Sequence, residues 1–147
     1  MFRTIPFEPG HIPQFLNYGG QDHLVLSVPP EELSQLNTHG EARTGLVDNR
    51  IVGCAGLIRM NDYRAVAWGL FQRTGNTDFL HIHMAIRRRL RSALTFKRIE
   101  AFVNPLSPKA MRWIALLGFR MEQPYIPYYF ADGSGAAQWA MYPNEVN

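Results

Sequence analysis

The sequence has almost no cysteine and no long hydrophobic run. Cys54 is its only cysteine, so no disulfide can form within the chain, and we expect a reducing compartment. The longest apolar stretches, such as Val66–Phe71, fall far short of the roughly 20 residues that a membrane-spanning helix needs. The first residues, Met1–Pro6, lack the apolar segment of a secretion signal. We therefore expect a cytoplasmic protein with no membrane span.

Lysine is also scarce, and arginine carries the basic charge. Two of the 15 basic residues, Lys97 and Lys109, are lysines, so the other 13 are arginines. Four arginines form one short run, Arg87, Arg88, Arg89 and Arg91. The formal net charge is only +3, which permits an anionic ligand but does not require nucleic acid. With 147 residues and 46% hydrophobic residues, residues 1–147 are predicted to form a single globular domain.

The first third of the chain reads as short elements separated by glycine and proline. We predict a strand over Arg3–Phe7, a helix over His11–Asn17, an extended segment over Leu24–Val28 and a second helix over Pro29–Asn37. Three strands then follow over Ala42–Val47, Ile51–Arg59 and Ala65–Gln72, joined by Asp48-Asn49-Arg50 and Asn61-Asp62-Tyr63. Such turn signals predict short hairpins.

The remainder alternates helices and strands. An apolar stripe of helical period predicts a helix from about Asp78 to Thr95, with Thr77 or Asp78 as its N-cap. A buried strand over Arg98–Val103 should then run parallel to the strand before the helix. Ser107-Pro108 begins another helix, which Gly118 ends. Strands over Phe119–Tyr129 and Ala137–Tyr142 complete the order β-α-α-β-β-β-α-β-α-β-β. The fold class is α+β: a mixed, mostly antiparallel central sheet flanked by helices.

This order, together with Trp113-Ile-Ala-Leu-Leu-Gly118-Phe119 at the end of the last helix, resembles the GNAT N-acetyltransferase superfamily. The element order is similar over nearly the whole chain, and the sequence itself over Arg98–Phe119. The helix ending, the Tyr-rich strand and the Asp-Gly turn look most similar to short GNAT-like proteins of tailed phages, some described as internal virion or assembly proteins.

The resemblance implies acetyl-CoA as cofactor. Its pantetheine arm would bond the main chain of Trp68–Gln72, and its pyrophosphate would lie on amides at the start of the next helix. The cofactor-binding residues implied are Leu70, Phe71, Gln72, Arg73, Thr74, Gly75, Asn76, Thr77 and, at the end of the parallel strand, Asn104. Because Asn104 precedes a proline, a role in a turn is the alternative for it.

Two positions depart from the family pattern. Gln72–Asp78 has one glycine where the family loop has two or three, and Asp78 would repel a phosphate. Ile114 stands four residues before Gly118, where the family often has a tyrosine acid. The structural positions are kept and the functional ones altered, which suits a fold whose acetyl transfer is impaired, changed or lost.

Acid–base chemistry therefore needs other residues. Tyr128 and Tyr129 on the last strands are candidate acids, with ordinary aromatic packing as the alternative. Glu122 and Glu100 are the carboxylates nearest the core strands, and either is a candidate base or part of a solvated strand face. His81 and His83 point to different faces of a helix, so they do not suit a shared metal, although a histidine proton carrier stays open.

Three functions remain open. The first is an acyl-CoA-dependent N-acyltransferase with a small-molecule or protein amine as acceptor. The second is a non-enzymatic GNAT-like protein of a phage, acting as a virion component or in virion assembly, which would place it in the host cytoplasm or the virion. The third and weakest is a nucleic-acid-associated regulator using the arginine face, where Arg87, Arg88 and Arg91 cluster and Arg89 stands aside.

Overall fold

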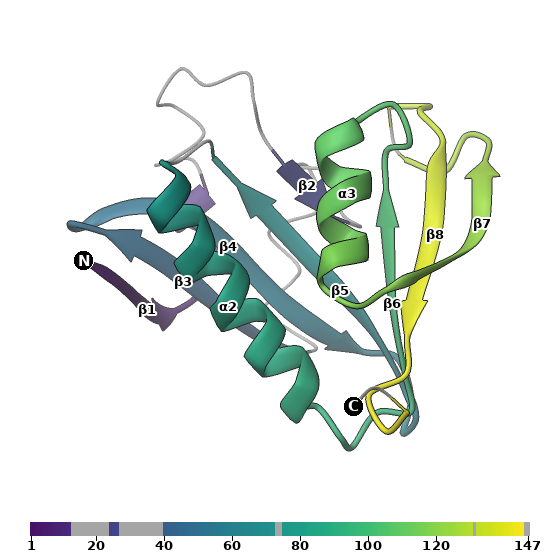
Figure 1. Ribbon diagram of the computed structural model, residues 1–147, viewed down its shortest axis with the longest axis horizontal. Coiled ribbons are helices and arrows are strands. Elements are labelled where there is room, and N and C mark those ends of the chain that lie inside the picture. The colour runs from purple at the N-terminus through teal and green to yellow at the C-terminus, as the bar shows by residue number, and fades with distance from the viewer. Residues whose placement is uncertain (13–23, 27–39, 73–74, 131, 146–147) are drawn as a thin grey trace.

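Eight strands form one sheet, and two helices lie on the same face of it (Figure 1). The computed structural model describes residues 1–12, 24–26, 40–72, 75–130 and 132–145. In chain order the elements are β1 (Phe2–Pro6), β2 (Leu24–Leu26), β3 (Gly40–Val47), β4 (Arg50–Arg59), β5 (Arg64–Phe71), α2 (Asn76–Ser92), β6 (Arg98–Val103), α3 (Pro108–Leu116), β7 (Arg120–Ile126) and β8 (Ala136–Met141). The strand order is β1-β3-β4-β5-β6-β8-β7, with β2 paired to β5 outside this path. The predicted α+β class and the mostly antiparallel sheet are confirmed.

Local sequence explains the turns. Asp48 and Asn49 both have positive φ, the geometry of a two-residue hairpin turn whose twist matches the strands β3 and β4. Asn61 Oδ1 accepts hydrogen bonds from the amides of Tyr63 and Arg64 and closes the next hairpin. Both turns lie where the sequence predicts them.

The two helices begin differently. At α3 the Ser107 Oγ accepts from the Ala110 amide and Pro108 follows, while Gly118 ends the helix at a φ of 105°, as predicted. The prediction for α2 is wrong: its N-cap is Gly75, which has no side chain to cap with, instead of Thr77 or Asp78. The helix also ends at Ser92, short of Thr95.

Each face of the sheet carries its own core. The face under α2 and α3 holds the larger cluster, in which Val52, Phe71 and Ile99 pack against Ile82 and Trp113 from the helices. The opposite face holds a smaller cluster of buried residues, which are Phe7, Ile12, Leu46, Ile51, Cys54, Trp68 and Leu70. Alternation along β5 directs Ala65, Ala67 and Phe71 to one face and Trp68 and Leu70 to the other, which is why the sheet is buried on both sides.

The sheet ends in an irregular strand. β7 pairs with β8 with register shifts between Met121 and Gln123 and between Gln123 and Ile126, and Pro124 lies within it. Six of its seven residues are exposed, and the strand ends before Tyr128, whose φ is positive. The predicted strand over Phe119–Tyr129 is therefore shorter than expected at its carboxyl end.

Some predictions fall outside the described residues. The predicted helix over Pro29–Asn37 does so entirely, and that over His11–Asn17 does so beyond Ile12. The expected extended segment over Leu24–Val28 is observed as β2 at Leu24–Leu26. Within the described ranges, neither helix combines the length and the apolar character that crossing a membrane requires.

Candidate functional site

The two parallel strands at the centre of the sheet separate halfway along. β5 and β6 pair at Arg64 with Arg98, Ala65 with Ile99 and Val66 with Glu100, and no further pair follows. Beyond this point Ala67–Phe71 and Ala101–Val103 diverge, so that the sheet opens into a V (Figure 1). We call this V the splay, and Glu100 lies at its apex. Diverging strands leave backbone N–H and C=O groups without a sheet partner, and those groups need another one.

β2 supplies that partner on the β5 wall. Leu24, Val25 and Leu26 pair with Phe71, Leu70 and Gly69, on the edge of β5 that β6 has left. The main chain at the predicted cofactor residues Leu70 and Phe71 is therefore already paired. The same pairing demonstrates that the β5 edge accepts an extended chain that carries amides. The main-chain groups of the β5 edge therefore match the amides of a pantetheine arm, which would pair with them only if β2 were displaced.

The start of α2 is a poorer match to a pyrophosphate. Gly75, Asn76 and Thr77 are exposed at the helix start, and no side chain caps it. First-turn amides lack intrahelical partners and carry the positive end of the helix dipole, which suits an anion. Asp78, however, places a carboxylate in the same turn. The predicted Arg73 and Thr74 lie outside the described residues.

Gln72 and Asn104 stand at the open ends of the two walls. The Gln72 amide donates to Val52 O at 2.9 Å, and its Oε1 is buried without a hydrogen-bond partner among the described residues. Asn104 Oδ1 accepts from the Leu106 amide at 2.9 Å, so its side-chain oxygen closes the turn before α3. Of these two predicted residues, Gln72 has a side-chain oxygen that accepts no hydrogen bond among the described residues, whereas the side-chain oxygen of Asn104 is already used.

The helix side of the splay has no proton donor at the family position. Ile114 is fully buried in the core. Its neighbour Trp113 donates from Nε1 to His83 Nδ1 at 3.0 Å, which requires that ring nitrogen to be unprotonated. Burial and the nearby Arg87 lower the pKa of His83. His83 is thus a neutral hydrogen-bond acceptor that joins α2 to α3.

Glu100 at the apex is held between two arginines. It is 8% exposed and lies 3.1 Å from Arg64 Nε and 2.9 Å from Arg98 Nη2. Gln138 Nε2 donates to the same carboxylate at 3.3 Å. Arg98 and Gln138 thus hydrogen-bond this buried carboxylate and Arg64 adds an ion pair, so that Glu100 closes the narrow end of the splay.

Glu122 belongs to the same group of charges, which we call the apex cluster (Arg64, Arg98, Glu100, Glu122 and Tyr142). It accepts hydrogen bonds from Arg98 and from the Tyr142 hydroxyl. These bonds, Arg98 first, lower the pKa of Glu122 from its ordinary value of 4.5 to about 2. A carboxylate this acidic is a poor proton acceptor, which does not favour the role of base predicted for Glu122 from the sequence.

The apex cluster should make stability depend on acid. Because the pKa of Glu122 is depressed in the folded protein, its contribution is complete above pH 4.5 and is lost as the pH falls towards about 2. Thermal unfolding midpoints of the wild type and Glu122→Gln should therefore differ at pH 6 and converge across this window. Glu145→Gln, which removes an exposed carboxylate outside the cluster, is the control. A constant gap between wild type and Glu122→Gln from pH 6 to pH 2 would contradict the ion pair.

The two candidate tyrosines differ in their surroundings. Tyr128 is 86% exposed on a turn. Tyr129 stacks on Phe102 of β6, with ring centroids 4.6 Å apart. Only Tyr129 is thus fixed against a wall of the splay.

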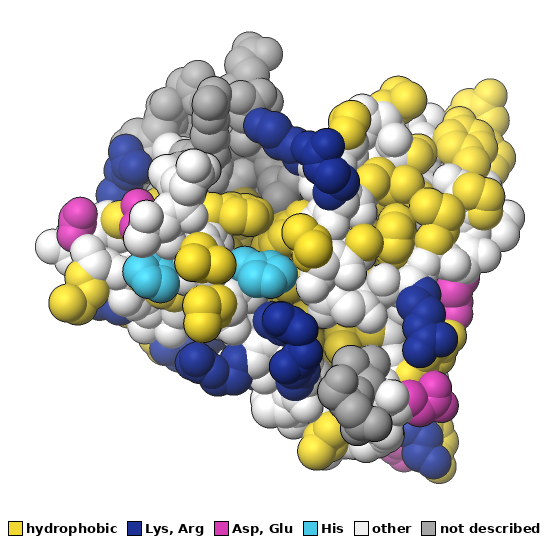
Figure 2. Space-filling view, viewed as in Figure 1, with side chains coloured by type: hydrophobic (Ala, Val, Ile, Leu, Met, Phe, Trp, Pro, Cys, Tyr) yellow, Lys and Arg dark blue, Asp and Glu magenta, His cyan; other side chains and the backbone are white. Residues whose placement is uncertain are grey.

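The arginine run divides as expected. All four arginines are exposed, and Arg89 forms a two-pronged ion pair with Glu41 of β3. Figure 2 shows basic side chains gathered over the carboxyl-terminal half of α2. His81 is exposed and stacks on Phe2, away from His83.

Sequence reasoning named Glu100 as a carboxylate near the core strands but did not place it at the apex of the splay. The place of Glu100 at the last paired position depends on where β5 and β6 part, and nothing in the sequence marks that point. The pairing of β2 with β5 joins residues more than 40 positions apart. The one available signal was the alternation of Arg98 and Glu100 with buried apolar residues.

Solved structures share this fold. The IAA acetyltransferase of Bacillus cereus superposes with a TM-score of 0.70 at 10% identity, covering 97% of this chain and 99% of that one. An acetyltransferase of Streptococcus agalactiae gives 0.69 at 17% identity, covering 96% and 98%. A GNAT-family acetyltransferase of Streptococcus pneumoniae gives 0.65 at 12% identity, covering 97% and 99%. No protein-family model and no curated protein matches the sequence. The described chain therefore has the GNAT fold, and identities this low establish the fold alone.

Proposed function

We propose that this protein is an N-acyltransferase that moves an acyl group from acetyl-CoA, or another acyl-CoA, to an amine. The observation that carries the proposal is the splay, whose β5 edge at Gly69–Phe71 already binds an extended, amide-bearing segment. The GNAT fold shared with acetyltransferases supports it. The acceptor is a small-molecule or protein amine whose identity the site does not specify.

The chain's own residues would divide the work along the splay. Acetyl-CoA supplies a thioester whose acyl group an amine can attack. The main chain of Leu70, Phe71 and Gln72 would hold the arm that β2 now replaces, and the amides of Asn76 and Thr77 would face its phosphates, beside the predicted Arg73 and Thr74. The attacking amine must lose a proton and the leaving thiolate must gain one.

Tyr129 is our proposed proton donor to the thiolate. Its ring is fixed on Phe102 of the β6 wall, whereas Tyr128 is almost fully exposed. Loss of turnover in Tyr129→Phe with retained cofactor binding and retained activity in Tyr128→Phe would support this assignment. Equal activity of the two variants would refute it.

Cofactor affinity should be limited by Asp78. We expect Asp78→Asn to strengthen acetyl-CoA binding by about two- to fivefold, because a charge at a helix N-terminus is worth about 0.3–1 kcal/mol. Asp62→Asn removes an exposed carboxylate at the β4–β5 turn and is the matched control. Isothermal titration calorimetry of the three proteins measures the effect. Absence of binding at millimolar acetyl-CoA in all of them would overturn the acyltransferase proposal.

A non-catalytic protein is the second candidate, favoured by the buried Ile114 and by β2 on the β5 edge. A role as a phage virion component or assembly protein rests on the sequence resemblance. Hydrogen exchange of the backbone amides of β2, and of Gly69–Phe71 opposite them, separates the two candidates. In an acyltransferase, acetyl-CoA should replace β2 on the β5 edge, so that the hydrogen-exchange protection of the β2 amides falls when acetyl-CoA is added. In a non-catalytic protein, the β2 amides should stay protected.

A further inference from the structure

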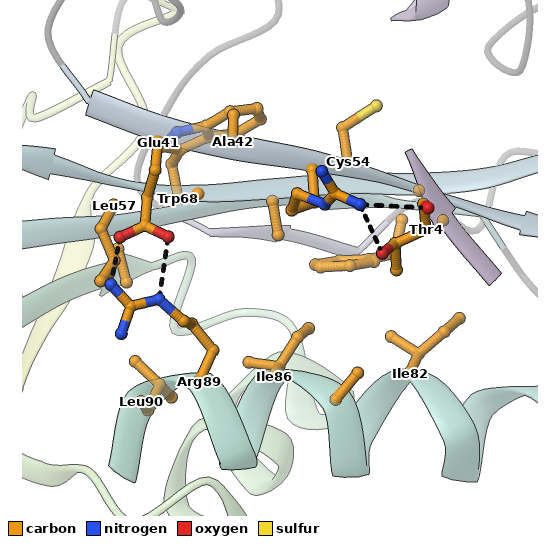
Figure 3. A pocket seen from close by; sticks show the side chains of 18 of the residues that line it. Thr4, Glu41, Ala42, Cys54, Leu57, Trp68, Ile82, Ile86, Arg89 and Leu90 are labelled. Carbon is orange, nitrogen blue, oxygen red and sulfur yellow. Dashed lines mark hydrogen bonds and ion pairs between the residues drawn. The ribbon is translucent and has the colours of Figure 1, made fainter. Parts of the chain in front are cut away.

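A cavity of about 370 Å³ lies between α2 and the sheet, and Ala67, Trp68 and Phe71 of β5 border both this cavity and the splay. Figure 3 shows Ile82, Ile86 and Leu90 of α2 pointing into it from one side, with the sheet forming the other. Cys54 and Trp68 belong to the core on the far face of the sheet, so they border the cavity with their backbones. The cavity is thus lined by α2, by strands β1, β3, β4 and β5, and by Leu117 and Phe119 after α3.

Small residues create this space. Gly45, Ala55 and Ala67 from the sheet and Ala85 from the helix line it. The ring of Phe71 does not fill the gap, because it lies so close to the backbone that a Cβ at Gly53 or Gly69 would collide with it. A cavity of about 150 Å³ with apolar walls is large enough to bind benzene. This one is large enough for a medium-length hydrocarbon chain.

The polar side chains of the lining are exposed at the surface and form two separate groups, Glu41 with Arg89 and Arg43 with Thr4 (Figure 3). Glu41 and Arg89 pair with each other there, with side chains 49% and 43% exposed. Arg43 is also exposed, and its Nη2 donates to the carbonyl and the hydroxyl of Thr4, both at 3.1 Å (Figure 3). No carboxylate pairs with Arg43 among the residues that the structure describes. Among the described lining residues, two guanidinium groups stand against one carboxylate, and the charge of Arg43 is not compensated by it.

We propose that this cavity binds an amphipathic carboxylate, with its hydrocarbon part under α2 and its carboxylate on Arg43. Apolar walls with a few polar groups at one end are typical of small-molecule sites and fix the orientation of the ligand. The guanidinium fork matches a carboxylate, and a single uncompensated charge suits a monoanion. The site is independent of the acyltransferase function proposed above and needs no acyl-CoA.

Decanoate and decanol share a hydrocarbon chain, and only decanoate has a carboxylate, so the pair separates binding of the chain under α2 from binding of the carboxylate to Arg43. We expect saturable binding of decanoate in calorimetry with the full chain. Arg43→Gln should weaken decanoate binding about tenfold, since hydrogen bonds to a charged group exceed neutral ones, and should leave decanol unchanged. Arg50→Gln, an exposed arginine on β4 outside the lining, is the matched control. Absence of binding at millimolar decanoate, or equal weakening of both ligands in Arg43→Gln, would overturn the proposal.

Filling the cavity tests its location. Ala85→Leu on the helix and Ala55→Val on the strand should each reduce binding of both ligands about tenfold or more, while the thermal unfolding midpoint stays the same or rises. Circular dichroism of each variant verifies folding, and two substitutions on opposite walls keep the test valid if one of them fails to fold. Unchanged binding in a folded variant would place the ligand elsewhere and refute the site.

Discussion

Replacing Trp113 with alanine should lower the free energy of unfolding by about 4 kcal/mol, because truncating a buried tryptophan leaves a large cavity. Trp113 is 3% exposed. Its ring meets Phe71 of β5 edge-on, with centroids 5.0 Å apart, and Phe79 of α2 at 5.2 Å. One side chain on α3 therefore joins the sheet to the other helix. Urea unfolding of both proteins measures the difference.

Trp113→Phe is the matched control for this prediction. It keeps an aromatic ring against Phe71 and Phe79 but removes the hydrogen bond to His83. We expect it to cost less than the alanine variant, with about 1 kcal/mol of the loss due to the hydrogen bond. A loss below about 1 kcal/mol for Trp113→Ala would mean that α3 does not depend on this contact.

Replacing Glu100 with alanine should cost about 3 kcal/mol, because removal of one member of a buried ion pair leaves the other without compensation. Arg64, whose side chain is 39% exposed, would lose this carboxylate, whereas Arg98, which is 27% exposed, would keep its bonds to Glu122. Water can reach them in part, which places the expected cost at the lower end of the usual range. Guanidinium chloride would screen the charges, so urea is the denaturant for the measurement.

Glu122→Ala is the comparison within the same cluster. Its side chain is 30% exposed and it shares Arg98 with Glu100, so we expect a smaller loss than for Glu100→Ala. The order of the two effects is the discriminating result. If Glu122→Ala cost as much as Glu100→Ala, burial at the apex of the splay would not be the source of the stability.

The sequence predicts the regular parts of this fold because local signals and tertiary structure agree there. The strand at Arg98–Val103 is observed with the bounds expected from its apolar run. The start of α3 at Ser107 and its end at Gly118 follow from side chains that satisfy the helix termini. A residue type that has one physical role at a helix end, such as serine at the start or glycine after the end, locates that helix end from the sequence alone.

The site is less predictable because its geometry depends on contacts between distant segments. The tyrosines at 128 and 129 are neighbours in sequence, yet only Tyr129 finds a ring to stack on. The acidity of Glu122 depends on Arg98, 24 positions away. The first turn of α2 shows the limit of local rules: Thr77 and Asp78 are good caps, but the helix starts two residues earlier.

The irregular strand β7 has a consequence for how copies of this chain meet one another. An edge strand offers a row of main-chain donors and acceptors to which a second molecule can add its own strand. In β7 the ring of Pro124 removes one donor, and the register shifts bend the remaining ones out of line. The charged side chains Arg120 and Glu122 are carried on the same edge. These features disfavour strand-by-strand association from this end of the sheet, even though the residues of β7 are mostly exposed.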